Sequence, residues 1–165
     1  EKMSVYRFSG YWKDVGTIDS LWDANMDMLS ATNKLDLFDP AWRVYSRNPI
    51  APPHYVGDRA VISHSLVTEG CEVMGEVQNS VLFNDVSVAE GAVVKYSILM
   101  PGAVIEKDAC VEYAIVAENA RVGARARVGA EPLAVSPEEW GITVIGSGAS
   151  IAEDRCIEPN TMVAD

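Results

Sequence analysis

The chain has 165 residues, of which 48% are hydrophobic, and a formal net charge of −11 at pH 7. This length and composition predict one folded domain with a short appendage and argue against disorder. The negative charge argues against nucleic acid or an anionic membrane surface as the main partner, because such complexes depend on clustered Lys and Arg.

The cysteines and the apolar runs indicate where such a chain would reside. Cys71, Cys110 and Cys156 are odd in number and lack metal-ligand spacing, which is typical of reduced thiols in a cytoplasmic protein. No apolar run reaches the length of a membrane span, and we expect no signal peptide. The sequence therefore predicts a cytoplasmic location.

The first part of the chain predicts a strand, a turn and a helix. Residues 1–8 are typical of a strand, and because no initiator Met precedes them we expect the tail of a longer protein. Thr17 is a good N-cap for a helix, and Asp19 in its first turn suits the helix dipole. The helix period is seen in apolar residues at Ile18, Leu21, Trp22, Met26 and Leu29.

Residues 35–45 predict a short connector with a strand-like piece around Val44. Residues 48–60 begin with a Pro-rich run, which favours extended backbone because each proline restricts the residue before it. We interpret 48–60 as a linker that covers one end of the next domain.

The most regular feature of the sequence is a repeat of constant period, with blocks of equal length that begin at Ser80, Ser97 and Ala114. Within each block branched apolar residues recur at every sixth position, and a small residue precedes most of them by two. This is the hexapeptide signature of a left-handed parallel β-helix built from triangular coils. The apolar positions are Leu82, Val88, Val94, Leu99, Ile105, Val111, Val116, Val122 and Val128.

Each block is one residue shorter than three full hexads, and the position of the missing residue can be identified. One side of each coil is a residue short, at the corners Tyr96–Ser97 and Tyr113–Ala114. The first coil is two residues shorter than the regular coils, so we expect Met74-Gly75-Glu76 to cut across one of its corners. Residues 131–141 predict a surface loop, after which Ile145, Ile151, Ile157 and Val163 give one more coil. The alternative is an ordinary half-buried sheet that happens to repeat.

The densest group of chemically useful side chains is Tyr11-Trp12-Lys13-Asp14, before the predicted helix. Functional sites often lie at such strand-to-helix turns. From residue types alone two interpretations stay open. Trp12 either packs against the helix or lines a site, and Asp14 is either a solvated turn residue or a functional carboxylate.

Residues 11–29, the Pro-rich linker, the hexapeptide coils and the run Trp140–Gly146 together resemble the C-terminal part of bacterial glucose-1-phosphate adenylyltransferases, also called ADP-glucose pyrophosphorylases. The resemblance covers nearly the whole chain. It implies an enzyme that makes ADP-glucose and pyrophosphate from ATP and glucose 1-phosphate for glycogen synthesis. Asp14 would then be a catalytic residue and one of two Asp ligands of Mg²⁺, and Trp12 would line the glucose pocket. Lys13 receives no role.

The resemblance also implies a domain organisation. Residues 1–47 would be the edge of an α/β nucleotidyltransferase domain, 48–60 the linker, and 61–165 a β-helix for oligomerisation and regulation. The family's N-terminal catalytic domain, with its Gly-rich nucleotide loop and second metal Asp, has no counterpart in these residues, so we expect the chain to be inactive alone. Its expected partners are that domain and further subunits, in a homo-tetramer or with a related subunit.

Effector binding is where the chain departs from sugar-bisphosphate-activated relatives. Glu118 stands where those members carry an Arg on the last regular coil. Arg121, Arg125 and Arg127 form a local basic group that could face an anionic effector, although a solvated surface is the alternative. We expect weak or different effector control.

Three other functional classes share this repeat. Hexapeptide acyltransferases use a His as general base, and the chain has only His54 and His64, both before the regular coils. Two histidines are also too few for the three-His metal site of β-helical carbonic anhydrases. A non-catalytic β-helix scaffold is the remaining alternative.

Overall fold

The computed structural model describes residues 2–30, 35–37, 39–45, 49–136 and 138–164. In this part of the chain one α-helix, α1 (Ile18–Asp27), precedes three six-stranded parallel sheets. The first sheet contains β1 (Tyr55–Val56), β4 (Glu72–Val73), β7 (Ser87–Val88), β10 (Val104–Ile105), β13 (Arg121–Val122) and β16 (Ser150–Ile151). The second contains β2 (Val61–Ser63), β5 (Glu76–Gln78), β8 (Val93–Lys95), β11 (Cys110–Glu112), β14 (Arg127–Val128) and β17 (Cys156–Ile157). The third contains β3 (Leu66–Val67), β6 (Val81–Leu82), β9 (Ile98–Leu99), β12 (Ala114–Val116), β15 (Thr143–Ile145) and β18 (Met162–Val163).

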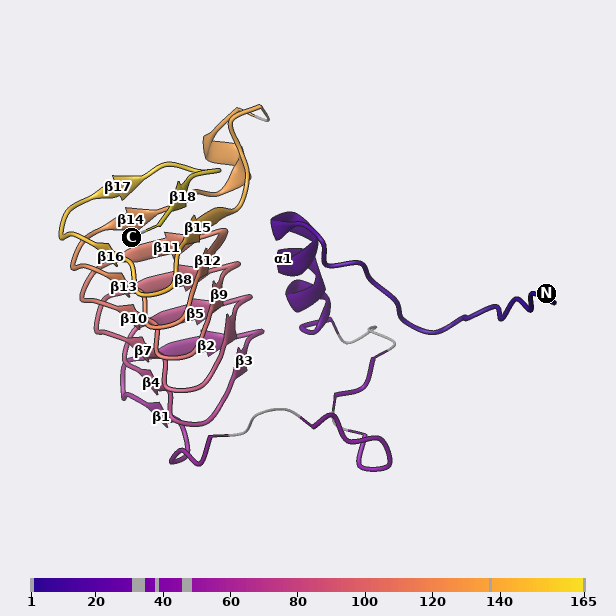
Figure 1. Cartoon of the computed structure of the whole chain (residues 1–165). Coiled ribbons are helices and arrows are strands. Elements are labelled where there is room, and N and C mark those ends of the chain that lie inside the picture. The colour runs from indigo at the N-terminus through magenta and orange to yellow at the C-terminus, as the bar shows by residue number, and fades with distance from the viewer. Residues whose placement is uncertain (1, 31–34, 38, 46–48, 137, 165) are drawn as a thin grey trace.

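Successive strands in the chain belong to successive sheets, so the backbone winds through stacked triangular coils (Figure 1). The pairing follows the sequence period, because Ile105 pairs with Val88 and Val122, which occupy the equivalent positions of the preceding and following coils. The predicted mainly-β fold, a parallel β-helix of hexapeptide coils, is therefore confirmed.

The core is one narrow column inside the coils. All nine of the predicted apolar positions in the regular blocks are at most 1% exposed, as are the small residues that precede most of them. Each buried Val, Ile or Leu contributes about 1.5–3 kcal/mol, so the stability accumulates coil by coil.

The short corner between the second and third sheets is made by residues in the left-handed region, with φ of 47° at Tyr96 and 48° at Tyr113. A residue in this region turns the chain sharply at a single position. Buried Ser97 supports it: its Oγ donates to the Lys95 carbonyl at 2.7 Å and accepts from the Ala114 amide at 3.2 Å. The Ser97 amide in turn donates to Ser80 Oγ at 3.1 Å.

The shortened first coil lies where the sequence predicts it. Val73 at the end of β4 pairs with Val88, and Glu76 at the start of β5 pairs with Val93. The connection from Val73 to Glu76 is therefore two residues shorter than the equivalent connection from Val88 to Val93. The shorter connection consists of Met74 and Gly75. A Cβ on Gly75 would lie 2.4 Å from the Ala92 carbonyl oxygen, so only glycine fits there.

Near the C-terminal end the coil is enlarged by the segment expected as a loop. Arg121 on β13 pairs with Ser150 on β16, so the chain between these two strands contains both the regular coil and the insertion. The insertion includes a short 3₁₀ helix, Pro132–Ala134. Afterwards Ile145 pairs with Val163, which closes the last coil.

In the N-terminal part of the chain the predicted helix is present, but the predicted strands are not found in the described residues. Thr17 caps α1, with its Oγ1 accepting from the Ser20 amide at 3.2 Å, and Asp19 lies in the first turn. Neither the described residues 2–8 nor the described residues around Val44 form a strand, because no described strand lies beside them to pair with. Strand β1 lies inside the range expected as linker, while the predicted boundary at residues 47 and 48 lies outside the described residues.

Helix α1 packs on the outer face of the third sheet (Figure 1). This face is apolar, and Ile98 and Ile115, which point out of the coils, are 0% and 3% exposed. The residues of α1 that contact this cluster are Ile18, Leu21, Trp22 and Met26.

Candidate functional site

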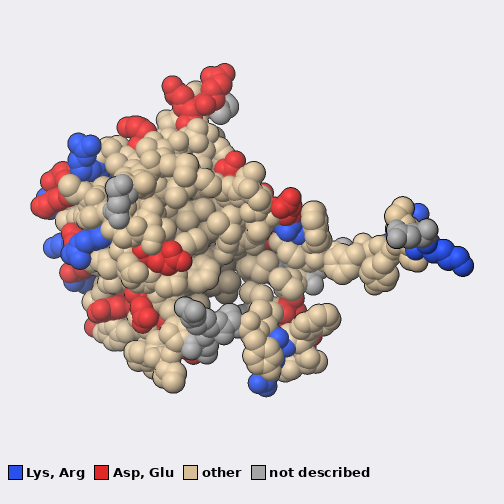
Figure 2. Space-filling view, viewed as in Figure 1, with Lys and Arg blue, Asp and Glu red and all other residues tan. Residues whose placement is uncertain are grey.

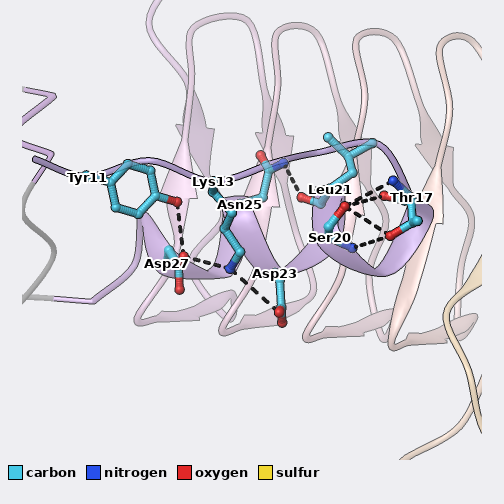
Figure 3. A network of polar contacts seen from close by, with 8 residues as sticks. All are labelled: Tyr11, Lys13, Thr17, Ser20, Leu21, Asp23, Asn25 and Asp27. Atoms are coloured by element: carbon cyan, nitrogen blue, oxygen red, sulfur yellow. Dashed lines mark hydrogen bonds and ion pairs between the residues drawn. The ribbon is translucent and has the colours of Figure 1, made fainter. Parts of the chain in front are cut away.

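The predicted site residues Trp12 and Asp14 lie on the segment that runs back along α1 (Figure 3 shows its neighbours Tyr11 and Lys13). The Asp14 side chain is exposed, and its Oδ1 accepts a 3.1 Å hydrogen bond from the Gly16 amide, which shapes the turn into the helix. The Trp12 side chain is 76% exposed. Trp12 thus presents its ring to the surface and does not pack into the helix interface.

A polar contact that the sequence did not predict fixes this segment. The Lys13 ammonium lies 2.8 Å from Asp27 Oδ2 and 3.6 Å from Asp23 Oδ2 (Figure 3). The Tyr11 hydroxyl donates to the same Asp27 oxygen at 3.0 Å. The available signal was the spacing of Asp23 and Asp27, which places two carboxylates on one face of a helix.

The pKa values of these groups shift as expected for a bonded set. The hydrogen bond from Lys13, more than any other contact, lowers the pKa of Asp27, and the same bond raises the pKa of Lys13. Loss of solvent and the bond to Asp27 raise the pKa of Tyr11. The segment is thereby tied to the last turn of α1, while Asp14 and Thr17 shape its first turn.

Asp14 fits the chemistry of a magnesium ligand but does not make a site by itself. Mg²⁺ is usually held by one or two carboxylates together with phosphate oxygens and waters. In the described residues no group of three His, Cys, Asp or Glu side chains could hold a metal ion. Asp14 can therefore supply one ligand, and the roles of Asp14 and Trp12 stay predictions.

The structure pairs two of the three predicted effector arginines with acids. Arg121 forms an ion pair with Glu106. Arg125 holds Asp154 in a two-bond contact of 2.7 and 2.8 Å and lies 3.1 Å from Glu153. These contacts raise the pKa of Arg125 and lower that of Asp154, in each case mainly through their shared hydrogen bonds.

Arg127 forms no ion pair with any residue that the structure describes. Figure 2 shows blue and red side chains intermingled on the side of the β-helix where β10, β13 and β16 lie. The basic group is thus largely balanced by acidic neighbours, and its role as an effector site stays a prediction.

The two histidines do not form a site with each other or with an acid in the described structure. Both are exposed, and His64 contacts Asn79, with 2.7 Å between Nδ1 and Oδ1. His64 lies on the first coil at the same left-handed corner as Tyr96 and Tyr113.

Two further properties bear on the class of protein. Within the described ranges no helix is long and apolar enough to cross a membrane. The three cysteines are free thiols, of which Cys71 is buried inside the first coil and Cys156 is exposed. Burial raises the pKa of Cys71 and of Cys110.

Known proteins are similar to this chain over nearly its whole length. A family model described as GlmU-like, C-terminal hexapeptide, matches residues 53–152. A glucose-1-phosphate adenylyltransferase of Acetivibrio thermocellus is 40% identical over 166 residues, which cover 98% of this chain and 39% of that relative. Proteins of the same name from Bacillus cereus and Bacillus anthracis are 51% identical over 116 residues, or 70% of this chain and 31% of each relative.

The chain thus spans between 31% and 39% of the length of these curated relatives. The match includes both the predicted motif before α1 and the β-helix, since it extends over 98% of the chain. The resemblance to glucose-1-phosphate adenylyltransferases is therefore confirmed, and the chain belongs to the GlmU-like C-terminal hexapeptide family.

Proposed function

We propose that this chain is the β-helical part of a glucose-1-phosphate adenylyltransferase, which makes ADP-glucose and pyrophosphate from ATP and glucose 1-phosphate for glycogen synthesis. The observation that carries the proposal is the 40% identity to such an enzyme over 98% of the chain. The exposed motif supports it, because Trp12 and Asp14 are presented at the surface, where a second domain can complete a site.

In this proposal Asp14 supplies one of the carboxylate ligands of Mg²⁺, and Trp12 offers its exposed ring to the sugar. The bound metal ion would polarise the α-phosphate and neutralise charge during phosphoryl-type transfer. The residues of this chain hold and orient: the Gly16 amide fixes one Asp14 oxygen, and Lys13 anchors the backbone beside Trp12. No nucleophilic side chain is needed, because positioning carries most of such a reaction.

The β-helix would serve assembly and regulation in a cytoplasmic enzyme, as a homo-tetramer or together with a related subunit. The outward faces of the first and second sheets supply surfaces for such contacts. Because Arg121 and Arg125 are paired with acids, we propose that control by anionic effectors is weak or uses other residues.

The test is an assay of pyrophosphate release from ATP and glucose 1-phosphate, performed on the whole protein and on residues 1–165 alone. The proposal expects pyrophosphate from the whole protein only, with ADP-glucose as the second product. Pyrophosphate formed without any dependence on glucose 1-phosphate would exclude this substrate. Acyl transfer from an acyl-thioester donor by the whole protein, in place of pyrophosphate release, would overturn the proposal.

A further inference from the structure

Tyr113 lies at the meeting point of three separate parts of the chain. Its ring stacks on Tyr96 of the neighbouring coil, with centroids 4.7 Å apart and an interplanar angle of 13°. It also lies 5.9 Å from the ring of Trp22 on α1 and 5.8 Å, edge-on, from Trp140. Such aromatic pairs stabilise the contact beyond the burial of their surfaces.

The backbone at this corner is unusual for such large residues. Tyr96 and Tyr113 both have positive φ, of 47° and 48°, a backbone conformation that is unfavourable for residues other than glycine. The conformation directs both rings onto one side of the corner. It also leaves the Tyr96 carbonyl oxygen to accept a 2.7 Å hydrogen bond from Trp22 Nε1.

Trp140 closes the group from the segment inserted before the last coil. Its indole N–H is enclosed without a hydrogen-bond partner in the described structure, so ring packing and not a polar bond holds it against Tyr113. Trp140 belongs to the same apolar cluster as Trp22 and Ile142.

The segment of Trp12 and Asp14 is attached to α1 at both ends. Lys13 and Tyr11 bond to Asp27 near the C-terminal end of the helix, and the turn through Asp14 leads directly into the Thr17 cap (Figure 3). A change in how α1 sits on the β-helix therefore moves this segment with it.

We propose that Tyr113 is a positioning residue: packed between Trp22 and Trp140, it fixes the orientation of α1 on the β-helix and thereby that of the turn that carries Trp12 and Asp14. This inference rests on the proposed function for its catalytic consequence. Its structural part, the control of α1 by Tyr113, is independent of it.

The experiment compares Tyr113→Ala, Tyr113→Phe and the control Tyr55→Ala in the whole protein. Tyr55 lies on β1, in another sheet, and is 56% exposed, so its loss removes an aromatic ring far from the cluster. The readouts are amide hydrogen exchange of residues 11–27 and of the β-helix strands, and kcat and KM for glucose 1-phosphate. For Tyr113→Ala we expect about tenfold faster exchange in α1, unchanged exchange in β7–β11, and kcat about tenfold lower.

Tyr113→Phe keeps the ring and should restore both readouts to about the wild-type level, as should the control. Unchanged α1 exchange in Tyr113→Ala would overturn the inference, and so would faster exchange with an unchanged kcat. If exchange in the β-helix strands also rises, Tyr113→Leu replaces Tyr113→Ala as the deciding variant, because it removes the ring and keeps apolar volume at the corner. Faster α1 exchange with lower kcat in this variant supports the inference, and no change overturns it. A wild-type protein that releases no pyrophosphate would refute the proposed function, while the exchange data still decide the control of α1.

Discussion

Trp22 on α1 donates a 2.7 Å hydrogen bond from its indole nitrogen to the carbonyl oxygen of Tyr96, 74 residues further along the chain. The bond joins the one described α-helix to a corner of the β-helix. A ten-residue helix is marginal in water by itself, so α1 depends on this sheet for its stability. The motif before α1 is consequently held by the β-helix, although the two are separated in sequence by a Pro-rich segment.

Ile98→Ala should loosen α1 without unfolding the coils. Ile98 points out of the third sheet yet is 0% exposed, because it belongs to the cluster that α1 covers. Its truncation should cost about 2–4 kcal/mol, mostly as weaker docking of α1. Hydrogen exchange of α1 amides measures this loss. Val93→Ala, at an outward position of the second sheet, is the matched control, and equal effects on α1 would refute the prediction.

Ile105→Ala should destabilise the β-helix itself. Ile105 is 0% exposed in the central column, so its removal should lower the free energy of unfolding by about 2–5 kcal/mol. Its neighbour Val104 points outward and is only partly buried, and Val104→Ala should cost less than about 1 kcal/mol. Urea denaturation followed by circular dichroism gives both values. Similar losses for the two variants would contradict the inward register.

Gly75→Ala should destabilise the shortened first coil. The new Cβ would lie 2.4 Å from the Ala92 carbonyl oxygen and 2.7 Å from that of Ala89, both backbone atoms that cannot move independently. A loss of about 1–3 kcal/mol is expected from this overpacking, visible as a lower Tm. Gly57→Ala is the control, because its closest neighbour is the Met74 sulfur, at 2.7 Å on a flexible side chain. The idea fails if the control lowers Tm as much as Gly75→Ala does.

The contact between Lys13 and Asp27 should depend on pH at both extremes. The folded pKa of Asp27 lies below its usual 3.8, so its stabilising effect is present above about pH 4 and is lost as pH falls through the folded value. The pKa of Lys13 is raised above 10.5, so its contribution is present below that pH and is lost as pH rises through the folded value.

An NMR titration of the Asp27 carboxyl carbon tests this contact. In Lys13→Met the pKa of Asp27 should move back up toward 3.8, because the bond from Lys13 is the largest cause of its depression. Lys2→Met, on the exposed N-terminal segment, should leave it unchanged. A wild-type Asp27 that titrates at or above 3.8 would show that the contact does not form in solution.

The repeat in the sequence was sufficient to predict the core and the coil. Residues spaced by six, such as Leu99 and Ile105, are buried because each coil has three sides of similar length. The two-residue shortening at Met74-Gly75 was also predictable. The strands on either side of it must stay paired with the next coil, so the missing residues have to come from the connection between them.

The docking of α1 was not predicted, although the sequence contains a signal for it. The third sheet has two adjacent apolar residues on each rung, Ile98-Leu99 and Ile115-Val116, so both of its faces are apolar. One of these faces must be covered. The partner could not be identified from the repeat, because α1 shows only an ordinary amphipathic pattern.

The site was predictable only in part. Trp12 and Asp14 were selected through a family resemblance, and the structure leaves both exposed, so no local packing distinguishes them. The hydrogen bonds from Tyr11 and Lys13 to Asp27 could not be predicted, because they depend on how the segment before α1 folds back along the helix. The strand expected in residues 1–8 is a second example. Its described part, residues 2–8, has an apolar pattern, but no described strand lies beside it to pair with.

The proposed function is tested most directly by pyrophosphate release by the whole protein with ATP and glucose 1-phosphate, measured for wild type, Asp14→Asn and Asp19→Asn. Asp19 is an exposed carboxylate in the first turn of α1 and serves as the matched control. We expect Asp14→Asn to lower turnover by about 100-fold or more with the oligomer unchanged, and Asp19→Asn to keep wild-type turnover. Full turnover in Asp14→Asn, or a wild-type protein that releases no pyrophosphate from these substrates, would contradict the proposal.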